Sequence, residues 1–254
     1  MFEVAADSYD RLMGRYLPTL AALFADAAGV RAGDLALDVG CGPGGLTREL
    51  AHRLGPERVT AVDPSPPFVA ACRARNPGVD VRTGAAEHLD WDDDAFDVAA
   101  ASLVVGFMSD PAAGVAEMAR VTRPGGRVAL CFWDVDSMPL LTTYWAAVAD
   151  ADPAAGGEAE LVGRREGDLA RLLTGAGLAG VESSTLTALA GYADQADWWS
   201  SFTGGVGPPG AQWLRMDTVQ RDATRAGAWE RLGRPAGPFT LEACAWCAVG
   251  VVPG

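Results

Sequence analysis

The sequence predicts an α/β fold in which a mostly parallel sheet of seven strands is covered by helices on both faces. Short apolar runs alternate along the chain with segments whose apolar residues recur at helical spacing. One of these runs, residues 35–39, ends in a cluster of glycines that leads into a helix-like segment. With 254 residues, 49% of them hydrophobic, the chain is long enough for one complete core. We therefore expect a single domain over residues 1–254.

The glycine cluster is the most informative stretch. Leu35 to Val39 is predicted to be a buried parallel strand, and leucines recur at helical spacing from Leu46 onward. Glycines between them allow a sharp turn and let a ligand approach the backbone, while the free N–H groups of the following helix point at that ligand. The glycines fit both G-x-G-x-x-G and G-x-G-x-G, so the spacing alone leaves the ligand open.

Two acids narrow the choice of ligand. Asp38 stands at the end of the first strand, where a dinucleotide site usually has an apolar residue. Asp63 ends a second strand-like run, residues 58–63, where a carboxylate can accept hydrogen bonds from ribose hydroxyls. The pattern indicates a ribose-bearing cofactor at the carboxyl edge of the sheet.

The remaining elements follow from the same patterns. Further strands are predicted at residues 79–83, 96–102, 128–133, 181–189 and 239–249. Helices are predicted at residues 140–148 and 168–174, and another begins at Asp110, a good N-cap followed by Pro111. Residues 1–29 should form an N-terminal helical cover. Residues 192–236, which contain Trp198, Trp199, Phe202, Trp213 and Trp229, are expected to form a helical lid inserted before the last strand.

Five segments in order, residues 38–44, 61–65, 84–90, 95–103 and 119–130, resemble the motifs of class I S-adenosylmethionine (SAM)-dependent methyltransferases. The resemblance is to the small-molecule group related to the ubiquinone and menaquinone biosynthesis methyltransferases, of the methyltransferase type 11 kind. It implies a Rossmann-like sheet with one antiparallel strand near an edge. It also implies SAM as cofactor and S-adenosylhomocysteine (SAH) as product.

The resemblance assigns cofactor contacts to the N-terminal segment and to the ends of the strands. They are Tyr9, Arg15, Asp38, Gly40, Cys41, Gly42, Gly44, Asp63, Pro64, Ser65, Ala86, Glu87, Ser102 and Leu103. Arg15 is expected to meet the SAM carboxylate, which suits a guanidinium fork. Many relatives have an Asp where Ala85 stands, so the adenine contact is expected from the backbone N–H near Ala86. Acceptor contacts are assigned to Tyr16, Phe107, Trp133 and Trp199.

No catalytic residue is assigned. Relatives with a histidine shortly after the fourth strand have a general base, but residues 104–108 contain none, and the two histidines, His52 and His88, lie elsewhere. Methyl transfer is an in-line displacement that accurate positioning of the reactants accelerates without a covalent intermediate. We therefore expect O-, C- or N-methylation of a small-molecule acceptor, driven mainly by positioning.

Two other classes of function use the same glycines. A NAD-dependent oxidoreductase would leave Asp38 without a role. The stronger alternative is a SAM-binding protein of this fold that catalyses a non-methylating reaction or acts as a ligand-binding partner, because the acceptor side shows no recognisable chemistry. Accumulation of SAH during turnover separates this alternative from a methyltransferase.

The composition of the chain limits the kinds of partner that we expect it to bind. The net charge is −13, and all 20 basic residues are arginines without a basic run, which disfavours nucleic acid. No apolar run of 18 residues and no secretory leader is present, so we expect neither a membrane span nor export. The oligomeric state is left open, a homodimer included.

The five cysteines, an odd number, fit a reducing cytoplasm. Cys244 and Cys247 form a C-x-x-C without a second pair, and in a strand these positions point to opposite faces, so we expect core residues. The acids at 90 and 92–94 are predicted to form a solvated loop. No metal site is expected.

Overall fold

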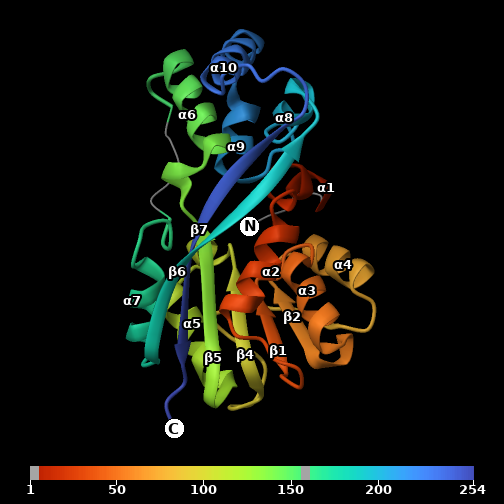
Figure 1. Cartoon of the computed structure of the whole chain (residues 1–254), viewed down its shortest axis with the longest axis vertical. Coiled ribbons are helices and arrows are strands. Elements are labelled where there is room, and N and C mark those ends of the chain that lie inside the picture. Colours follow the sequence, from red (N-terminus) through yellow and green to blue (C-terminus); the bar gives the residue numbers. More distant parts are fainter. Residues whose placement is uncertain (1–5, 156–160) are drawn as a thin grey trace.

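The computed structural model describes residues 6–155 and 161–254, which fold around a seven-stranded sheet in the order β3-β2-β1-β4-β5-β7-β6 (Figure 1). The strands are β1 (Ala36–Val39), β2 (Val59–Asp63), β3 (Asp80–Thr83), β4 (Phe96–Ser102), β5 (Thr122–Trp133), β6 (Ala179–Tyr192) and β7 (Phe239–Val251). Strands β1 to β5 run parallel to one another, and β7 pairs antiparallel with both β5 and β6. The predicted fold class is confirmed, including the antiparallel strand next to an edge.

Apolar residues on alternate positions of the strands build two cores, one on each face of the sheet. Ala36 in β1 belongs to the core shared with α2 (Leu17–Ala27) and α3 (Gly45–Leu54), whereas Leu37 and Val39 belong to the core shared with α5 (Pro111–Val121) and α7 (Asp168–Gly175). The alternation follows from the two-residue period of a strand. Asp38 is therefore on the same face of β1 as Ala36, towards α2 and α3.

The structure confirms the predicted helix start at Asp110. The Asp110 side chain accepts hydrogen bonds from the backbone N–H groups of Ala112 and Ala113, at 3.1 and 3.0 Å, as predicted for the N-cap of α5. The other helices are α1 (Ala6–Tyr9), α4 (Pro66–Arg75), α6 (Pro139–Ala151), α8 (Gln195–Trp199), α9 (Gly207–Arg215) and α10 (Thr218–Arg231). A π-helical turn spans Asp10–Gly14, and 3-10 turns span Pro56–Arg58, Val105–Phe107 and Val135–Ser137.

The long strands β6 and β7 carry the inserted helices beyond the sheet. β5 pairs with β7 only as far as Trp133 opposite Ala245, while β6 and β7 remain paired up to Tyr192 opposite Phe239. The two strands therefore project past the carboxyl end of β5, and Figure 1 shows α6, α8, α9 and α10 gathered at that end. The predicted strand of residues 181–189 is longer than expected because its pairing with β7 continues past Leu189.

The aromatic residues of the insertion pack against one another, within the same core that α2 and α3 share with the sheet. Phe202 stacks on Tyr144 of α6 with ring centroids 4.3 Å apart, and Trp198 packs on Trp229 at 5.4 Å. Trp199 is 5% exposed and contacts the rings of several of these residues. These contacts join α6, α8 and α10 into one helical layer above the sheet.

The N-terminal segment is helical over its described part, residues 6–27, with a π-helical turn between α1 and α2. Residues 1–5 of the predicted cover lie outside the described residues. Strand β5 begins earlier than the predicted strand of residues 128–133, and the Gly125 N–H within it donates to Val252 O, just past the end of β7.

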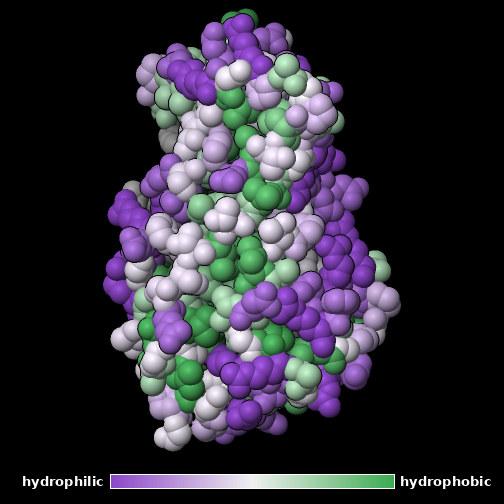
Figure 2. All heavy atoms as spheres, in the orientation of Figure 1, coloured by the Kyte–Doolittle hydropathy of each residue, from purple (hydrophilic) through white to green (hydrophobic). Residues whose placement is uncertain are grey.

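The exposed surface is mixed in character. Figure 2 shows hydrophilic residues dense over the flank that α3 and α4 form in Figure 1, with hydrophobic residues in a column along the centre of the face. Within the described part of the chain, no helix is both long enough and apolar enough to cross a membrane.

Candidate functional site

The loop after β1 is attached to the neighbouring strand β2. The N–H groups of Gly40 and Cys41 both donate to Val62 O, at 2.8 and 3.0 Å. Gly40 has φ of +71°, and a Cβ at this position would come within 2.4 Å of the Val104 side chain. Only glycine fits here, because the backbone conformation and the close packing both exclude a side chain.

The next two glycines face different surroundings. Gly44, with φ of +94°, precedes α3, and a Cβ there would come within 2.2 Å of the Asn76 amide nitrogen. Gly42 has φ of +52°, but a Cβ there would meet no protein atom within 4 Å. Gly44 is therefore required by internal packing, whereas the backbone at Gly42 borders open space that a ligand can fill.

Asp63, at the carboxyl end of β2, connects this loop to the start of α4. Its Oδ2 accepts the N–H of Gly42 at 2.9 Å, and its Oδ1 accepts the N–H of Ser65 at 2.8 Å. The side chain is 6% exposed, and burial raises the pKa of this carboxyl. Each oxygen keeps a lone pair for a further donor, since a carboxylate has about four acceptor positions.

Asp38 has one satisfied and one unsatisfied oxygen. Thr47, in the first turn of α3, donates its hydroxyl to Oδ2 at 2.6 Å. Oδ1 is buried and has no partner among the described residues. Burial raises the pKa of Asp38 to about 7, against the opposing effect of the Thr47 hydrogen bond. A buried acceptor without a donor is costly, so Oδ1 is suited to a cationic or N–H donor from a ligand.

The raised pKa of Asp38 gives a pH-dependent expectation. Between its ordinary value of 3.8 and about 7, the folded protein keeps a proton that the unfolded chain has released. The free energy of unfolding of the ligand-free protein should therefore fall as the pH rises through this window. Asp38→Asn cannot titrate and should lose less stability over the same window. Denaturant unfolding of both proteins at about pH 5 and about pH 8 measures the difference; equal losses would contradict the assignment.

Six of the predicted cofactor residues line one small cavity at the carboxyl edge of the sheet, with a volume of about 20 Å³. They are Tyr9, Asp38, Gly40, Cys41, Gly42 and Ser102. Tyr9 packs edge-on against Phe68, and burial raises the pKa of its hydroxyl. This phenol therefore stays protonated at neutral pH.

A second cavity, of about 60 Å³, shares Tyr9 with the first and is lined mainly by apolar side chains. Leu103, Phe107 and Trp133, three residues predicted to contact cofactor or acceptor, line it. Leu12, Met13 and the segment 206–209 line it as well.

Arg15 is engaged elsewhere. Its guanidinium forms an ion pair with Asp197 of α8, with Nη1 donating to Oδ2 at 3.0 Å, and lies 4.9 Å from the centre of the Tyr192 ring. The structure therefore directs Arg15 to the insertion, and the predicted contact with the SAM carboxylate has no support from this geometry. The physical reason is that the Asp197 carboxylate already binds the guanidinium group that was expected to bind the carboxylate of SAM.

The remaining predicted cofactor residues do not line the small cavity. Pro64 is exposed and Ser65 is buried beside Asp63, while Ala86 is 8% exposed. Glu87 accepts the N–H of Asp110 at 3.0 Å, so its carboxylate holds the start of α5. Their contacts with a cofactor stay predictions.

The predicted acceptor residues differ in their accessibility. Phe107 is 42% exposed at the border of the second cavity. Trp133 is 4% exposed, and its indole N–H has no partner among the described residues. Tyr16 is fully buried, accepts a hydrogen bond from the Tyr192 hydroxyl at 3.4 Å, and lines neither cavity. Trp199 also lines neither cavity, because it is packed in the aromatic core of the insertion.

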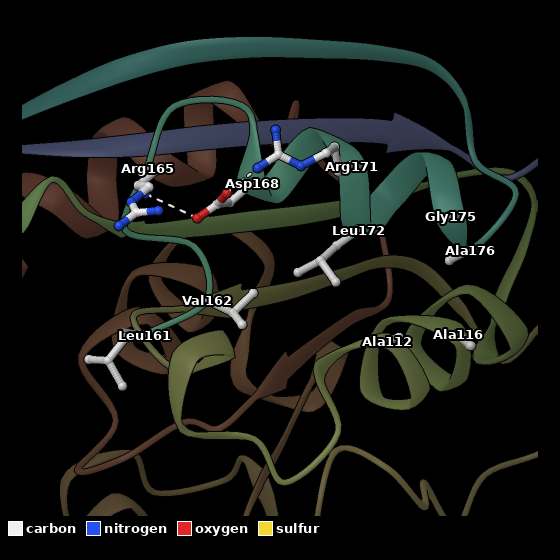
Figure 3. Close-up of a pocket in the computed structure, with 10 residues that line it drawn as sticks. All are labelled: Ala112, Ala116, Leu161, Val162, Arg165, Asp168, Arg171, Leu172, Gly175 and Ala176. Carbon is white, nitrogen blue, oxygen red and sulfur yellow. Dashed lines mark hydrogen bonds and ion pairs between the residues drawn. The ribbon is translucent and has the colours of Figure 1, made fainter. Parts of the chain in front are cut away.

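A much larger hollow lies away from the glycine loop. It has a volume of about 430 Å³ and opens between α5, which contributes Ala112 and Ala116, and α7, which contributes Leu172 (Figure 3). The Asp168 carboxylate at this hollow is already engaged, because it accepts the backbone N–H of Arg165 and forms an ion pair with Arg171. None of the predicted cofactor residues lines it, so volume alone does not identify the site.

Metal ligation has no candidate in the parts of the chain that the structure describes, since no group of three His, Cys, Asp or Glu side chains converges there. All five cysteines are free thiols. Cys247 is buried and Cys244 is half-buried, in β7.

The sequence patterns do not predict two parts of the site. Thr47 is one, although a polar residue in the first turn after the glycines is a visible signal for a partner of Asp38. The segment 206–209 is the other, and it borders the second cavity although it lies more than 70 residues after Trp133 in the sequence. Its Gly and Pro composition gives no sign of where it packs.

Comparison with known proteins shows what part of this chain is similar to. Residues 37–130 match the family described as a methyltransferase domain. The malonyl-[acyl-carrier protein] O-methyltransferase of Serratia marcescens is 36% identical over 116 residues, covering 46% of this chain and 45% of that protein. The ubiquinone/menaquinone biosynthesis C-methyltransferase UbiE of Bdellovibrio bacteriovorus is 36% identical over 105 residues, covering 40% and 45%. The chain thus spans about half the length of these curated relatives.

A solved structure shares the fold. The YcgJ protein of Bacillus subtilis superimposes with a TM-score of 0.59 at 18% identity, covering 92% of this chain and 98% of that one. The predicted resemblance to the class I methyltransferases is confirmed by these matches.

Proposed function

We propose that this chain, which carries a class I SAM-dependent methyltransferase domain, transfers the methyl group of SAM to a small-molecule acceptor. The observation that carries the proposal is the convergence of three features at one edge of the sheet. Asp38 has a buried oxygen without a donor among the described residues, Gly42 borders open space, and both oxygens of Asp63 keep acceptor capacity. These features fit a ligand with an ammonium group and two neighbouring hydroxyls.

The residues present have distinct tasks in this proposal. Asp38 Oδ1 would accept a hydrogen bond from the amino group of SAM, and that cation would favour the ionised form of the carboxyl. Asp63 would accept hydrogen bonds from the ribose hydroxyls. Gly42 would allow the ligand to lie against the backbone. Tyr9 would cover the reacting centre, since it borders both cavities.

The chemistry is a displacement at carbon. When bound, SAM supplies a methyl group on a positively charged sulfur that leaves as a neutral thioether. The chain contributes by holding the acceptor in line with that methyl group and by excluding water from the apolar cavity. The described residues that line the apolar cavity include Tyr9 but no His, Asp, Glu, Lys or Arg. The acceptor would therefore arrive with its nucleophile already reactive, for example as a carboxylate, an acidic phenol or a nucleophilic carbon.

Turnover separates this proposal from a non-methylating activity of the same fold. The protein is incubated with SAM and a panel of small carboxylic acids, phenols and amines, and both SAH and methylated product are measured. The proposal expects SAH to accumulate in a one-to-one ratio with a methylated acceptor. An acceptor that is converted to an unmethylated product, with SAM intact, would overturn it.

A further inference from the structure

The apolar cavity is lined by hydrophobic side chains, and one of its lining residues, Trp133, has a buried indole N–H without a partner among the described residues. Its lining comes from the N-terminal segment, the ends of β4 and β5, the stretch between β5 and α7, and the insertion. The lining residues include Tyr9, Leu103, Trp133, Leu141, Leu161 and residues 206–209. Such a lining favours an apolar ligand, because removing apolar surface from water drives binding.

The position of this cavity is fixed by the turn after β4. Ser102 lines the small cavity at the glycine loop, and the next residue, Leu103, lines the apolar one. Leu103 has φ of +60°, an uncommon conformation for a leucine, and its N–H donates to Cys131 O at 2.9 Å. Tyr9 borders both cavities from the N-terminal segment. A ligand in the apolar cavity therefore lies next to one held at the glycine loop.

Trp133 at the end of β5 supplies the polar feature. Its side chain is 4% exposed, and its indole N–H is buried without a partner among the described residues. Tyr16 packs edge-on against the ring at 5.5 Å and does not accept the N–H. Buried indole N–H groups usually find an acceptor. An oxygen atom of a ligand in the cavity that Trp133 lines would satisfy this donor.

We propose that the apolar cavity is the acceptor subsite and that it takes an apolar body bearing an oxygen, of the phenol or carboxylic acid class, with that oxygen accepting from Trp133 Nε1–H. The inference rests on the proposed methyltransferase function, for which it specifies the class of acceptor. An amine acceptor is disfavoured, because an amine that accepted this hydrogen bond would engage the lone pair it needs for attack.

The size of the cavity requires a movable border. A volume of about 60 Å³ holds about two water molecules. A phenol therefore needs the border to move outward. Two glycines with positive φ, Gly205 at +72° and Gly207 at +61°, flank Val206 in that border. Rotation at these glycines would widen the cavity without disturbing the sheet.

The test uses two probes of the same shape, p-cresol and p-xylene, which differ by an O–H in place of a methyl group. Calorimetry first establishes that wild type and variants bind SAH. NMR titration of the SAH-saturated proteins then measures the affinity for each probe. Wild type should bind p-cresol about tenfold more tightly than p-xylene, the preference expected for one hydrogen bond to an otherwise unpaired donor.

Trp133→Phe keeps the apolar lining but removes the donor. It should abolish the preference for p-cresol and leave the affinity for p-xylene nearly unchanged. The matched control is Trp246→Phe, because the Trp246 N–H donates to Arg164 O at 3.0 Å and this residue lines neither cavity. The control should retain the preference.

A second readout does not depend on a folded variant. The indole N–H resonance of Trp133 in the SAH-saturated wild type should shift downfield with p-cresol and much less with p-xylene. If SAH binds but neither probe does, or if p-cresol is bound without any involvement of Trp133, this inference is wrong while the proposed function stands. Loss of SAH binding by the wild type would instead overturn the proposed function itself.

Discussion

Gly42→Ala is expected to abolish SAM binding in a protein that stays folded. The new methyl group would meet no protein atom within 4 Å, so it enters the space reserved for the ligand. We expect the affinity for SAM to fall by more than about 100-fold, because the clash would push the ligand away from the loop and remove several contacts. Each tenfold loss of affinity corresponds to about 1.4 kcal/mol. The left-handed backbone at φ of +52° adds a cost of about 1–2 kcal/mol in stability.

The matched control for Gly42→Ala is Gly180→Ala. Gly180 has a similar φ of +58°, and a Cβ there would also meet no protein atom within 4 Å, but it lies at the start of β6, away from the glycine loop. The control should show the same loss of stability with normal SAM affinity. Titration calorimetry and thermal unfolding of both variants check this. Normal binding by Gly42→Ala would mean that the ligand does not lie against this loop.

Asp63→Ala should weaken SAM binding by about 100-fold or more, because two hydrogen bonds to a charged group, at about 1.5–3 kcal/mol each, are lost. The structure adds an effect on stability. Asp63 also accepts the N–H groups of Gly42 and Ser65, so the alanine variant loses the attachment of the loop to α4. We expect the free energy of unfolding to fall by about 2 kcal/mol, within the range for hydrogen bonds to charged groups.

Asp63→Asn separates the two contributions. The amide keeps one acceptor oxygen, but its nitrogen faces either the Gly42 or the Ser65 N–H and cannot accept from it. Both SAM affinity and stability, measured by titration calorimetry and denaturant unfolding, should lie between wild type and Asp63→Ala. An Asp63→Ala protein that binds SAM like wild type would show that the carboxylate does not contact the cofactor.

The fold is predictable because its signals are local. Each signal is contained in a few consecutive residues. This holds for the seven apolar runs, the glycines after β1 and the Asp110 cap, and all of them appear in the structure close to where the pattern predicts them. The placement of Asp38 and Asp63 at the same edge follows from parallel pairing of β1 with β2, since the carboxyl ends of parallel strands meet.

The side-chain partners are less predictable. Arg15 pairs with Asp197, which is 182 residues away in the sequence, so no local pattern announces the contact. The burial of Trp199 in an aromatic core and the contact of residues 206–209 with the apolar cavity likewise depend on how the insertion folds back over the sheet. Such contacts are set by tertiary packing, which helical or strand periodicity does not encode.

The most direct measurement of the central claim is a calorimetric titration of the wild-type protein with SAM in the presence of EDTA. The acids and glycines at the carboxyl ends of β1 and β2 should bind one SAM per chain, and chelation should leave the affinity unchanged, because the proposed contacts are backbone, carboxylate and hydroxyl groups. No heat of binding, or binding that EDTA abolishes, would contradict the assignment of this edge of the sheet as the cofactor site.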